Sequence, residues 1–134
     1  MSRTRIRTAA TIAAVTAAAV AGLIGAGAAH AAPAMPGGYY AGTVTSFPPG
    51  NTVWYGKSFT GSSVINNTAI GWAFPGRVYP GRSVLDNAEV VVIDYSGTPV
   101  GFVRDELTPD GRGGYWGRSI NGRTTLLTFH LSRG

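Results

Sequence analysis

The chain carries its strongest β-strand signal in the segment AEVVVIDYSG, residues 88–97. The four consecutive β-branched residues Val90 to Ile93 lose rotamer freedom in a helix and fit the pleated surface of a sheet. The wider segment from Arg82 to Ser96 contains no Gly or Pro, and its apolar residues also fit a helical stripe. We interpret the segment as a strand, with at most one helical turn over Ser83 to Ala88.

Ser96-Gly97 predicts a two-residue turn after this strand, and the resulting hairpin has a consistent register. The expected pairs are Ile93 with Val100, Val91 with Phe102, and Glu89 with Arg104. Apolar side chains meet along the hairpin and opposite charges meet at its far end. The sequence therefore predicts that a strand from Val100 to Arg104 pairs with a strand from Ala88 to Tyr95.

Asn121-Gly122 predicts a second hairpin, because both residues tolerate the positive φ of a type I′ turn. In this register Trp116 lies opposite Leu127. The face that continues through Phe129 and Leu131 is expected to be core, and the opposite face carries Ser119, Thr124, Thr128 and His130.

Gly and Pro interrupt the remaining sequence from Tyr39 onward too often for stable helices. The predicted strands are Tyr39–Ser46, Thr52–Phe59, Val64–Ile65, Ala69–Phe74, Ala88–Tyr95, Val100–Arg104, Tyr115–Ile120 and Arg123–Leu131. Many short strands with regular turn signals predict a small all-β domain of about seven or eight strands. We expect an antiparallel β-sandwich or a closed or partly open β-barrel.

The N-terminal residues have the pattern of a helical signal peptide. Three arginines precede an uncharged Ala-rich run over residues 8–28, and Ala29-His30-Ala31 supplies small residues around a cleavage point. Cleavage is expected near Ala31-Ala32, which predicts a secreted protein without membrane association after cleavage. An uncleaved membrane anchor is the alternative. The expected organisation is a signal peptide over 1–31, a flexible arm over 32–38 and a secreted β-domain over 39–134.

Charge and cysteine content narrow the function classes. The chain has a net charge of +5, but three of its eleven basic residues lie in the leader, which leaves eight basic residues against six acidic ones. A net charge of about +2 gives no reason to expect a nucleic-acid partner. The chain has no cysteine, which excludes disulfides and thiolate metal sites. We expect neither a cofactor nor a bound metal.

Aromatic residues are the most informative candidate site. Tyr39-Tyr40, Trp54-Tyr55 and Tyr115-Trp116 are adjacent pairs, and adjacent side chains on a strand point to opposite faces. At least one ring of each pair should therefore leave the core, unless loops cover both. Exposed rings and planar guanidinium groups can bind a sugar, a protein or an anionic polymer. The candidate binding residues are Trp54, Tyr55, Trp72, Tyr115, Trp116 and Arg118.

Catalytic side chains are scarce. His130 is the sole histidine after the predicted cleavage site, and no G-x-S-x-G motif follows that site. Asp105, Glu106 and Asp110 are interpreted as an ordinary solvated loop, with calcium binding as the alternative. We predict no catalytic residues.

The leading hypothesis is a non-catalytic secreted β-domain that binds or inhibits an extracellular protein through its surface. A carbohydrate or cell-envelope binding module is the first alternative. A row of coplanar exposed rings would favour polysaccharide, whereas an aromatic patch with a polar rim would favour a protein. The second alternative is a small secreted hydrolase that uses His130 with a carboxylate.

Overall fold

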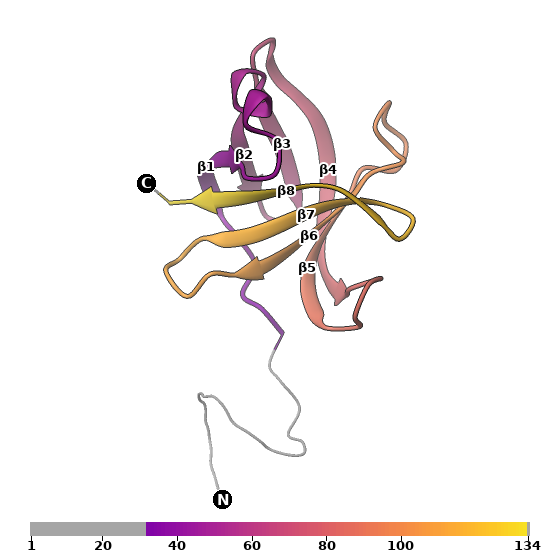
Figure 1. Cartoon of the computed structure of the whole chain (residues 1–134). Helices are drawn as coiled ribbons and strands as arrows, with labels where there is room; N and C mark the ends of the chain where they lie inside the picture. The colour runs from indigo at the N-terminus through magenta and orange to yellow at the C-terminus, as the bar shows by residue number, and fades with distance from the viewer. Residues whose placement is uncertain (1–31, 134) are drawn as a thin grey trace, which may run out of the picture. The chain divides into compact units, whose positions relative to one another are not determined.

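The computed structural model describes residues 32–133 and shows an all-β fold, a closed antiparallel barrel of eight strands (Figure 1). The predicted leader, residues 1–31, lies outside the described residues. The elements are β1 (Gly38–Val44), the short 3-10 turn η2 (Pro48–Thr52), β2 (Trp54–Thr60), β3 (Ser63–Thr68), β4 (Gly71–Arg82), β5 (Glu89–Asp94), β6 (Arg104–Pro109), β7 (Tyr115–Asn121) and β8 (Thr124–Ser132). Each strand pairs with its neighbour in sequence, and β8 closes the barrel by pairing with β1. Of the two predicted architectures, the chain adopts the barrel.

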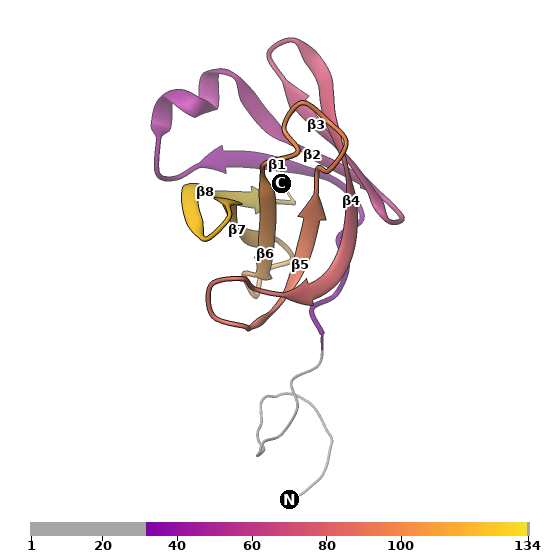
Figure 2. The same cartoon turned by 90° about the vertical axis from the view of Figure 1, so that its right-hand side faces the viewer.

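The up-and-down order places alternate connections at the same end of the barrel. The β1–β2, β3–β4, β5–β6 and β7–β8 connections share one end, which we call the open end. The first three lie toward the top of Figure 2, while the N-terminal arm and the β4–β5 loop lie toward the bottom.

Alternate side chains of all eight strands point into the barrel interior. Edge-to-face aromatic contacts join Tyr40 to both Phe59 and Tyr115 in the core. The buried members of the core cluster are Tyr40, Phe59, Val64, Val78, Val91, Ile93, Tyr95, Leu107, Tyr115, Phe129 and Leu131. The unbroken run in β5 is explained by burial on both faces, because Val91 and Ile93 join this cluster while Val90 and Val92 are buried outside it.

The predicted Ser96-Gly97 hairpin is wrong. Residues between β5 and β6 form consecutive turns. The amide of Thr98 donates to the backbone carbonyl of Tyr95, and the amide of Gly101 donates to the backbone carbonyl of Thr98. Strand β6 begins only at Arg104. Pro99 has no amide hydrogen to give to a ladder, which disfavours a strand directly after the turn.

The later start of β6 changes every expected pair of this hairpin. Val91 faces Leu107 and Ile93 faces Asp105, in place of Phe102 and Val100. Arg104 lies opposite Asp94, and Glu89 pairs with Arg82 at 3.8 Å instead of with Arg104.

The fourth strand is longer than predicted. Pro-Gly pairs are common in turns, but β4 runs through the two pairs at residues 75–76 and 80–81. The chain bends near the first pair, where Phe74 has a φ of 54° and the pairing with β3 shifts between Val64 and Asn66. A β-bulge of this kind absorbs an irregular residue without ending the strand.

The β7–β8 hairpin exists, but its register differs from the prediction. Asn121 pairs with Thr124, and the register shifts between Ser119 and Ile120. Trp116 consequently lies opposite His130 and is exposed, not part of the core face. Phe129 and Leu131 are buried as expected. Ser119 lies opposite Leu127 and lines the interior with it, which contradicts its predicted place on the other face.

Candidate functional site

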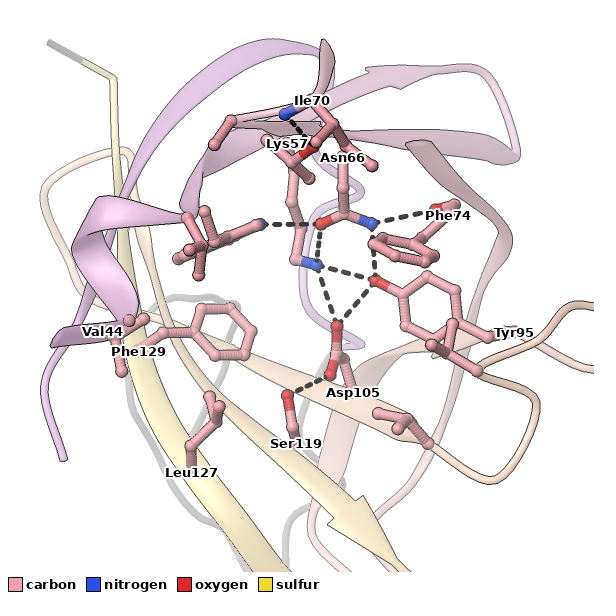
Figure 3. A pocket seen from close by; sticks show the side chains of 17 residues that line it. Val44, Lys57, Asn66, Ile70, Phe74, Tyr95, Asp105, Ser119, Leu127 and Phe129 are labelled. Atoms are coloured by element: carbon pink, nitrogen blue, oxygen red, sulfur yellow. Dashed lines mark hydrogen bonds and ion pairs between the residues drawn. The ribbon is translucent and has the colours of Figure 1, made fainter. Parts of the chain in front are cut away.

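A cavity of about 470 Å³ occupies the barrel interior toward the open end (Figure 3). Its wall comes from the strands and from the β1–β2, β3–β4 and β5–β6 connections. The larger apolar lining residues are Val44, Val53, Trp54, Ile70, Phe74, Val100, Val103, Leu127 and Phe129. The polar lining residues are Lys57, Asn66, Thr68, Tyr95, Asp105 and Ser119.

Two glycines allow aromatic rings to lie flat along the wall. A Cβ atom at Gly117 would overlap the ring of Phe129, and one at Gly42 would overlap the ring of Trp54. The two rings meet at 5.3 Å between centroids. Because both rings lie against glycine backbone, space remains in the interior beside them.

A buried ion pair lies among the apolar lining residues. Lys57 is 3% exposed and its Nζ lies 2.9 Å from Oδ2 of Asp105, which is 2% exposed. The same ammonium donates to Oδ1 of Asn66 at 2.8 Å and to the hydroxyl of Tyr95 at 2.7 Å. Tyr95 in turn donates to Oδ2 of Asp105 at 2.9 Å. Buried charges are tolerated when they are paired and hydrogen-bonded in this way.

Two further side chains extend this network toward the wall. The indole N–H of Trp54 donates to Oδ1 of Asn66 at 2.8 Å, and the hydroxyl of Ser119 donates to Oδ1 of Asp105 at 2.6 Å. The amide group of Asn66 donates to the carbonyl of Phe74 at 2.9 Å. We call these six side chains, Trp54, Lys57, Asn66, Tyr95, Asp105 and Ser119, the polar network.

The electrostatics of the network favour a charged lysine and a neutral tyrosine. Burial acts to lower the pKa of Lys57, but the neighbouring Asp105 carboxylate and Tyr95 raise it above its usual value of 10.5. Burial, together with the negative charge of Asp105, raises the pKa of Tyr95 from 10.0 to about 12. At neutral pH the lysine is therefore an ammonium ion and the tyrosine carries its proton.

The predicted aromatic site residues lie in three different places. Trp54 lines the cavity, Tyr115 is buried in the core, and Tyr55, Trp72 and Trp116 are exposed. The expectation that each adjacent aromatic pair sends a ring outward is confirmed. The outward members are Tyr39, Tyr55 and Trp116.

One group of exposed rings forms a small outer cluster. Tyr39 and Trp72 are 6.3 Å apart with an interplanar angle of 87°, and the hydroxyl of Tyr39 donates to the carbonyl of Tyr55 at 3.1 Å. We call Tyr39, Tyr55 and Trp72 the outer aromatic cluster. The two measured ring planes are perpendicular, so this pair is not the coplanar arrangement expected for a polysaccharide.

Arg118 holds a loop in place. Its guanidinium lies 3.4 Å from Oε1 of Glu106 and donates to the hydroxyl of Ser83 at 3.1 Å. Glu106 also accepts from the amide of Val84 at 2.9 Å and from Arg104 at 3.0 Å. These contacts tie the β4–β5 loop to the outside of β6 and β7.

The prediction of a solvated acidic loop is wrong for two of its three residues. Asp105 and Glu106 are buried in β6, on opposite faces of the strand, because β6 starts later than predicted. Asp110 alone follows the strand, where it accepts hydrogen bonds from the amides of Arg112 and Gly114. Within residues 32–133, no group of three or more His, Asp or Glu side chains is arranged to hold a metal ion.

His130 lies on the outer face of β8, away from the cavity. Its Nε2 is 2.7 Å from Oδ2 of Asp110, and its ring lies 4.3 Å from that of Trp116. The hydrogen bond with His130 lowers the pKa of Asp110 below its usual value. The carboxylate partner that the hydrolase alternative requires is present, but His130 is not among the residues that line the cavity.

The sequence reasoning missed most of the polar network. Lys57, Asn66, Tyr95, Asp105 and Ser119 were not among its site residues. The available signal was Lys57, the single lysine of a chain that otherwise uses arginine. The burial of this lysine, however, depends on Asn66 in β3, on Tyr95 after β5 and on Asp105 in β6, which no local pattern around Lys57 indicates.

No described helix is long and apolar enough to cross a lipid bilayer. Comparison with protein-family models, with curated proteins and with solved structures finds no match for this chain.

Proposed function

We propose that this barrel binds a small, mostly apolar molecule in its interior cavity. The observation that carries the proposal is a cavity of about 470 Å³ with a largely aliphatic and aromatic wall and a few converging polar groups. Ligand pockets have volumes of about 300 to 1,000 Å³ and this kind of lining, and the mouths of β-barrels are common places for them. An eight-stranded barrel has an interior just wide enough to hold one small ligand.

The loops at the open end support entry from that side. Ile70 lines the cavity and is 86% exposed, and Val53 also lines it while exposed to solvent. Phe47 and Phe102, on the β1–β2 and β5–β6 connections, are exposed as well. Exposed apolar side chains around a cavity are typical of a site that takes up apolar molecules.

The polar network supports a preformed site. Its members are joined by hydrogen bonds of 2.6 to 2.9 Å along the path Ser119, Asp105, Lys57, Asn66 and Trp54. Side chains held in this way lose little further freedom when a ligand binds, which lowers the entropic cost of binding.

The test uses the neutral dye N-phenyl-1-naphthylamine, whose emission rises in an apolar environment. Leu127 lines the cavity, whereas its neighbour Leu126 is exposed and is not among the lining residues. Leu127→Trp should fill the cavity and weaken dye binding by about tenfold or more, since it displaces apolar contacts worth over about 1.4 kcal/mol. Leu126→Trp, the same change outside the cavity, should bind the dye as the wild type does.

Two outcomes would contradict the cavity as the binding site. One is wild-type protein that does not enhance dye emission at any accessible concentration. The other is equal loss of binding in Leu126→Trp and Leu127→Trp. Circular dichroism of both variants shows whether each retains the β-barrel.

The outer aromatic cluster favours a second function, binding of an extracellular protein at the surface. Exposed Tyr and Trp side chains supply large, rigid contact areas at protein interfaces. The test is retention of a protein from culture supernatant by the immobilised barrel. A partner that the wild type retains should be lost with Trp72→Ala. It should still be retained by Phe102→Ala, which removes an exposed ring outside the cluster. Equal retention by the two variants would rule out the cluster. The carbohydrate-binding and hydrolase alternatives stay predictions.

A further inference from the structure

We infer that the cavity selects a neutral ligand whose polar end donates a hydrogen bond, such as an alcohol or a phenol, and excludes carboxylates. This inference rests on the proposed function of the cavity. Most side-chain hydrogen-bond donors of the lining are already engaged within the protein.

The charged donor of the cavity is fully used. An ammonium group has three N–H donors. Those of Lys57 go to Asn66 at 2.8 Å, Tyr95 at 2.7 Å and Asp105 at 2.9 Å. No donor of this lysine remains for a ligand carboxylate.

The neutral side-chain donors of the lining are engaged as well. Both N–H groups of Asn66 have acceptors, the carbonyl of Phe74 and the hydroxyl of Tyr95. The remaining donors are those of Trp54, Thr68, Tyr95 and Ser119, and each donates to a protein acceptor.

Backbone amides in the loops around the cavity follow the same pattern. The amides of Val53, Ala69 and Val103 donate to carbonyls of neighbouring loop residues. Those of Ile70 and Val100 donate to threonine hydroxyls. A ligand that needs donors from the protein would have to break one of these bonds, which costs about as much as it would gain.

Within the polar network, by contrast, acceptor capacity remains at Ser119 and Asp105. A hydroxyl oxygen has two lone pairs and a carboxylate oxygen can accept more than one hydrogen bond. Ser119 Oγ donates to Asp105 Oδ1, and within residues 32–133 neither oxygen has a second hydrogen bond. Ser119 is partly exposed and lines the cavity below Asp105 in Figure 3. A donor on the ligand can therefore bond to Ser119 Oγ without disturbing the network.

Charge balance points to the same ligand class. The ammonium of Lys57 and the carboxylate of Asp105 neutralise each other at 2.9 Å. A ligand carboxylate would be buried without a free donor or an uncompensated cation, and an ammonium would be buried near Lys57. Either would bear the large cost of burying an unpaired charge.

The test is a matched ligand series measured by isothermal titration calorimetry at neutral pH. Decanol offers one donor, methoxydecane has the same chain without a donor, and decanoate offers a negative charge. Decanol should bind about tenfold more tightly than methoxydecane, the gain expected for one hydrogen bond. Decanoate should bind at least about tenfold more weakly than decanol.

Two nearly isosteric variants test the role of Ser119. Ser119→Val removes the hydroxyl and covers Asp105 Oδ1 with methyl groups, so the preference for decanol over methoxydecane should disappear. Ser119→Thr adds the same bulk but keeps the hydroxyl, so the preference should remain. If Ser119→Val does not fold, the wild-type ligand series still decides the question.

The outcomes separate this inference from the proposed function. Decanoate binding as tightly as decanol, or methoxydecane binding as tightly as decanol, would overturn the donor rule and leave an apolar cavity. Failure of all three compounds to bind, and of the dye as well, would overturn the proposed function itself.

Discussion

Lys57 and Asp105 form an ion pair with almost no access to solvent, at 3% and 2% exposure. Removal of two charges from water costs several kcal/mol per ion, so the pair is stable only because its members are also hydrogen-bonded. Tyr95, Asn66 and Ser119 supply those bonds. The ion pair is therefore better explained as fixing the arrangement of the interior side chains than as adding to the free energy of unfolding.

Removal of one member should be far more damaging than removal of both. Lys57→Met should lower the free energy of unfolding by about 3 to 5 kcal/mol, because it leaves the Asp105 carboxylate buried without its partner. The double variant Lys57→Met, Asp105→Leu should recover much of that loss. Urea denaturation measures the free energy of unfolding of the single and the double variant.

The exposed pair of Arg77 and Asp94 is the control for this comparison. Its atoms are only 2.6 Å apart, but the arginine side chain is 67% exposed. Arg77→Met should therefore cost less than about 1 kcal/mol. The single variant Asp105→Leu completes the comparison. If the double variant lost as much free energy of unfolding as Lys57→Met and Asp105→Leu lose together, the two buried charges would not be coupled.

The raised pKa of Tyr95 predicts a loss of stability at alkaline pH. An unfolded tyrosine releases its proton near pH 10.0, while the folded one keeps it up to about 12. The stabilising contribution is thus complete below 10.0 and is lost as the pH rises to about 12. The raised pKa of Lys57 acts in the same direction above 10.5.

Comparison with Tyr95→Phe isolates the tyrosine part of this effect. The free energy of unfolding of the wild type should fall more steeply than that of the variant between pH 10 and about 12. The difference in tyrosinate absorbance between the wild type and Tyr95→Phe should show that the pKa of Tyr95 lies above 10.0. Parallel pH profiles for the two proteins would contradict the raised pKa.

At the scale of the strands, glycines in β1 and β7 shape the cavity wall. Gly117 faces Phe129 across the β7–β8 pair, and a Cβ atom there would overlap the phenyl ring. Gly117→Ala should therefore lower the free energy of unfolding by about 1 to 3 kcal/mol and push the ring into the cavity.

Thermal unfolding and dye binding together measure this effect. Gly37→Ala is the control, since a Cβ atom at Gly37 meets nothing within 4 Å and the change should stay within about 0.5 kcal/mol. Dye affinity should fall for Gly117→Ala and stay unchanged for Gly37→Ala. Full stability of Gly117→Ala would mean that the ring has another place to lie.

At the scale of the whole molecule, closure of the barrel depends on the strand nearest the predicted leader. β1 begins at Gly38 and pairs with both β2 and β8. Just before it, the carbonyl of Ala34 accepts a hydrogen bond from the hydroxyl of Tyr115 at 2.8 Å. Cleavage of the predicted leader would therefore have to leave β1 intact for the barrel to close.

Intact-mass measurement of the protein in culture supernatant tests this requirement. The expected N-terminus lies near Ala32, which leaves Ala34 and all of β1 in the mature chain. Full-length chain retained in the cells would contradict export. A mature N-terminus beyond Tyr39 would contradict a barrel closed by β1.

Local patterns in the sequence were enough to predict strands, the all-β class and the split of adjacent aromatic residues. Each of these depends on neighbouring residues alone: β-branched runs, turn residues and the alternation of side chains along a strand. Tyr39-Tyr40 and Tyr115-Trp116 divide between surface and core for that reason.

The tertiary structure alone decided the register, the closure and the candidate site. A shift of pairing by a few residues moved Asp105 from a predicted loop into the barrel, opposite Ile93 and Ser119. Lys57, on β2, meets it there across the interior of the closed barrel. Pairings between distant segments depend on the packing of the whole interior, and a pattern with a period of two residues fits several registers equally well. The ligand cavity is for this reason a property of the closed barrel and not of any single segment.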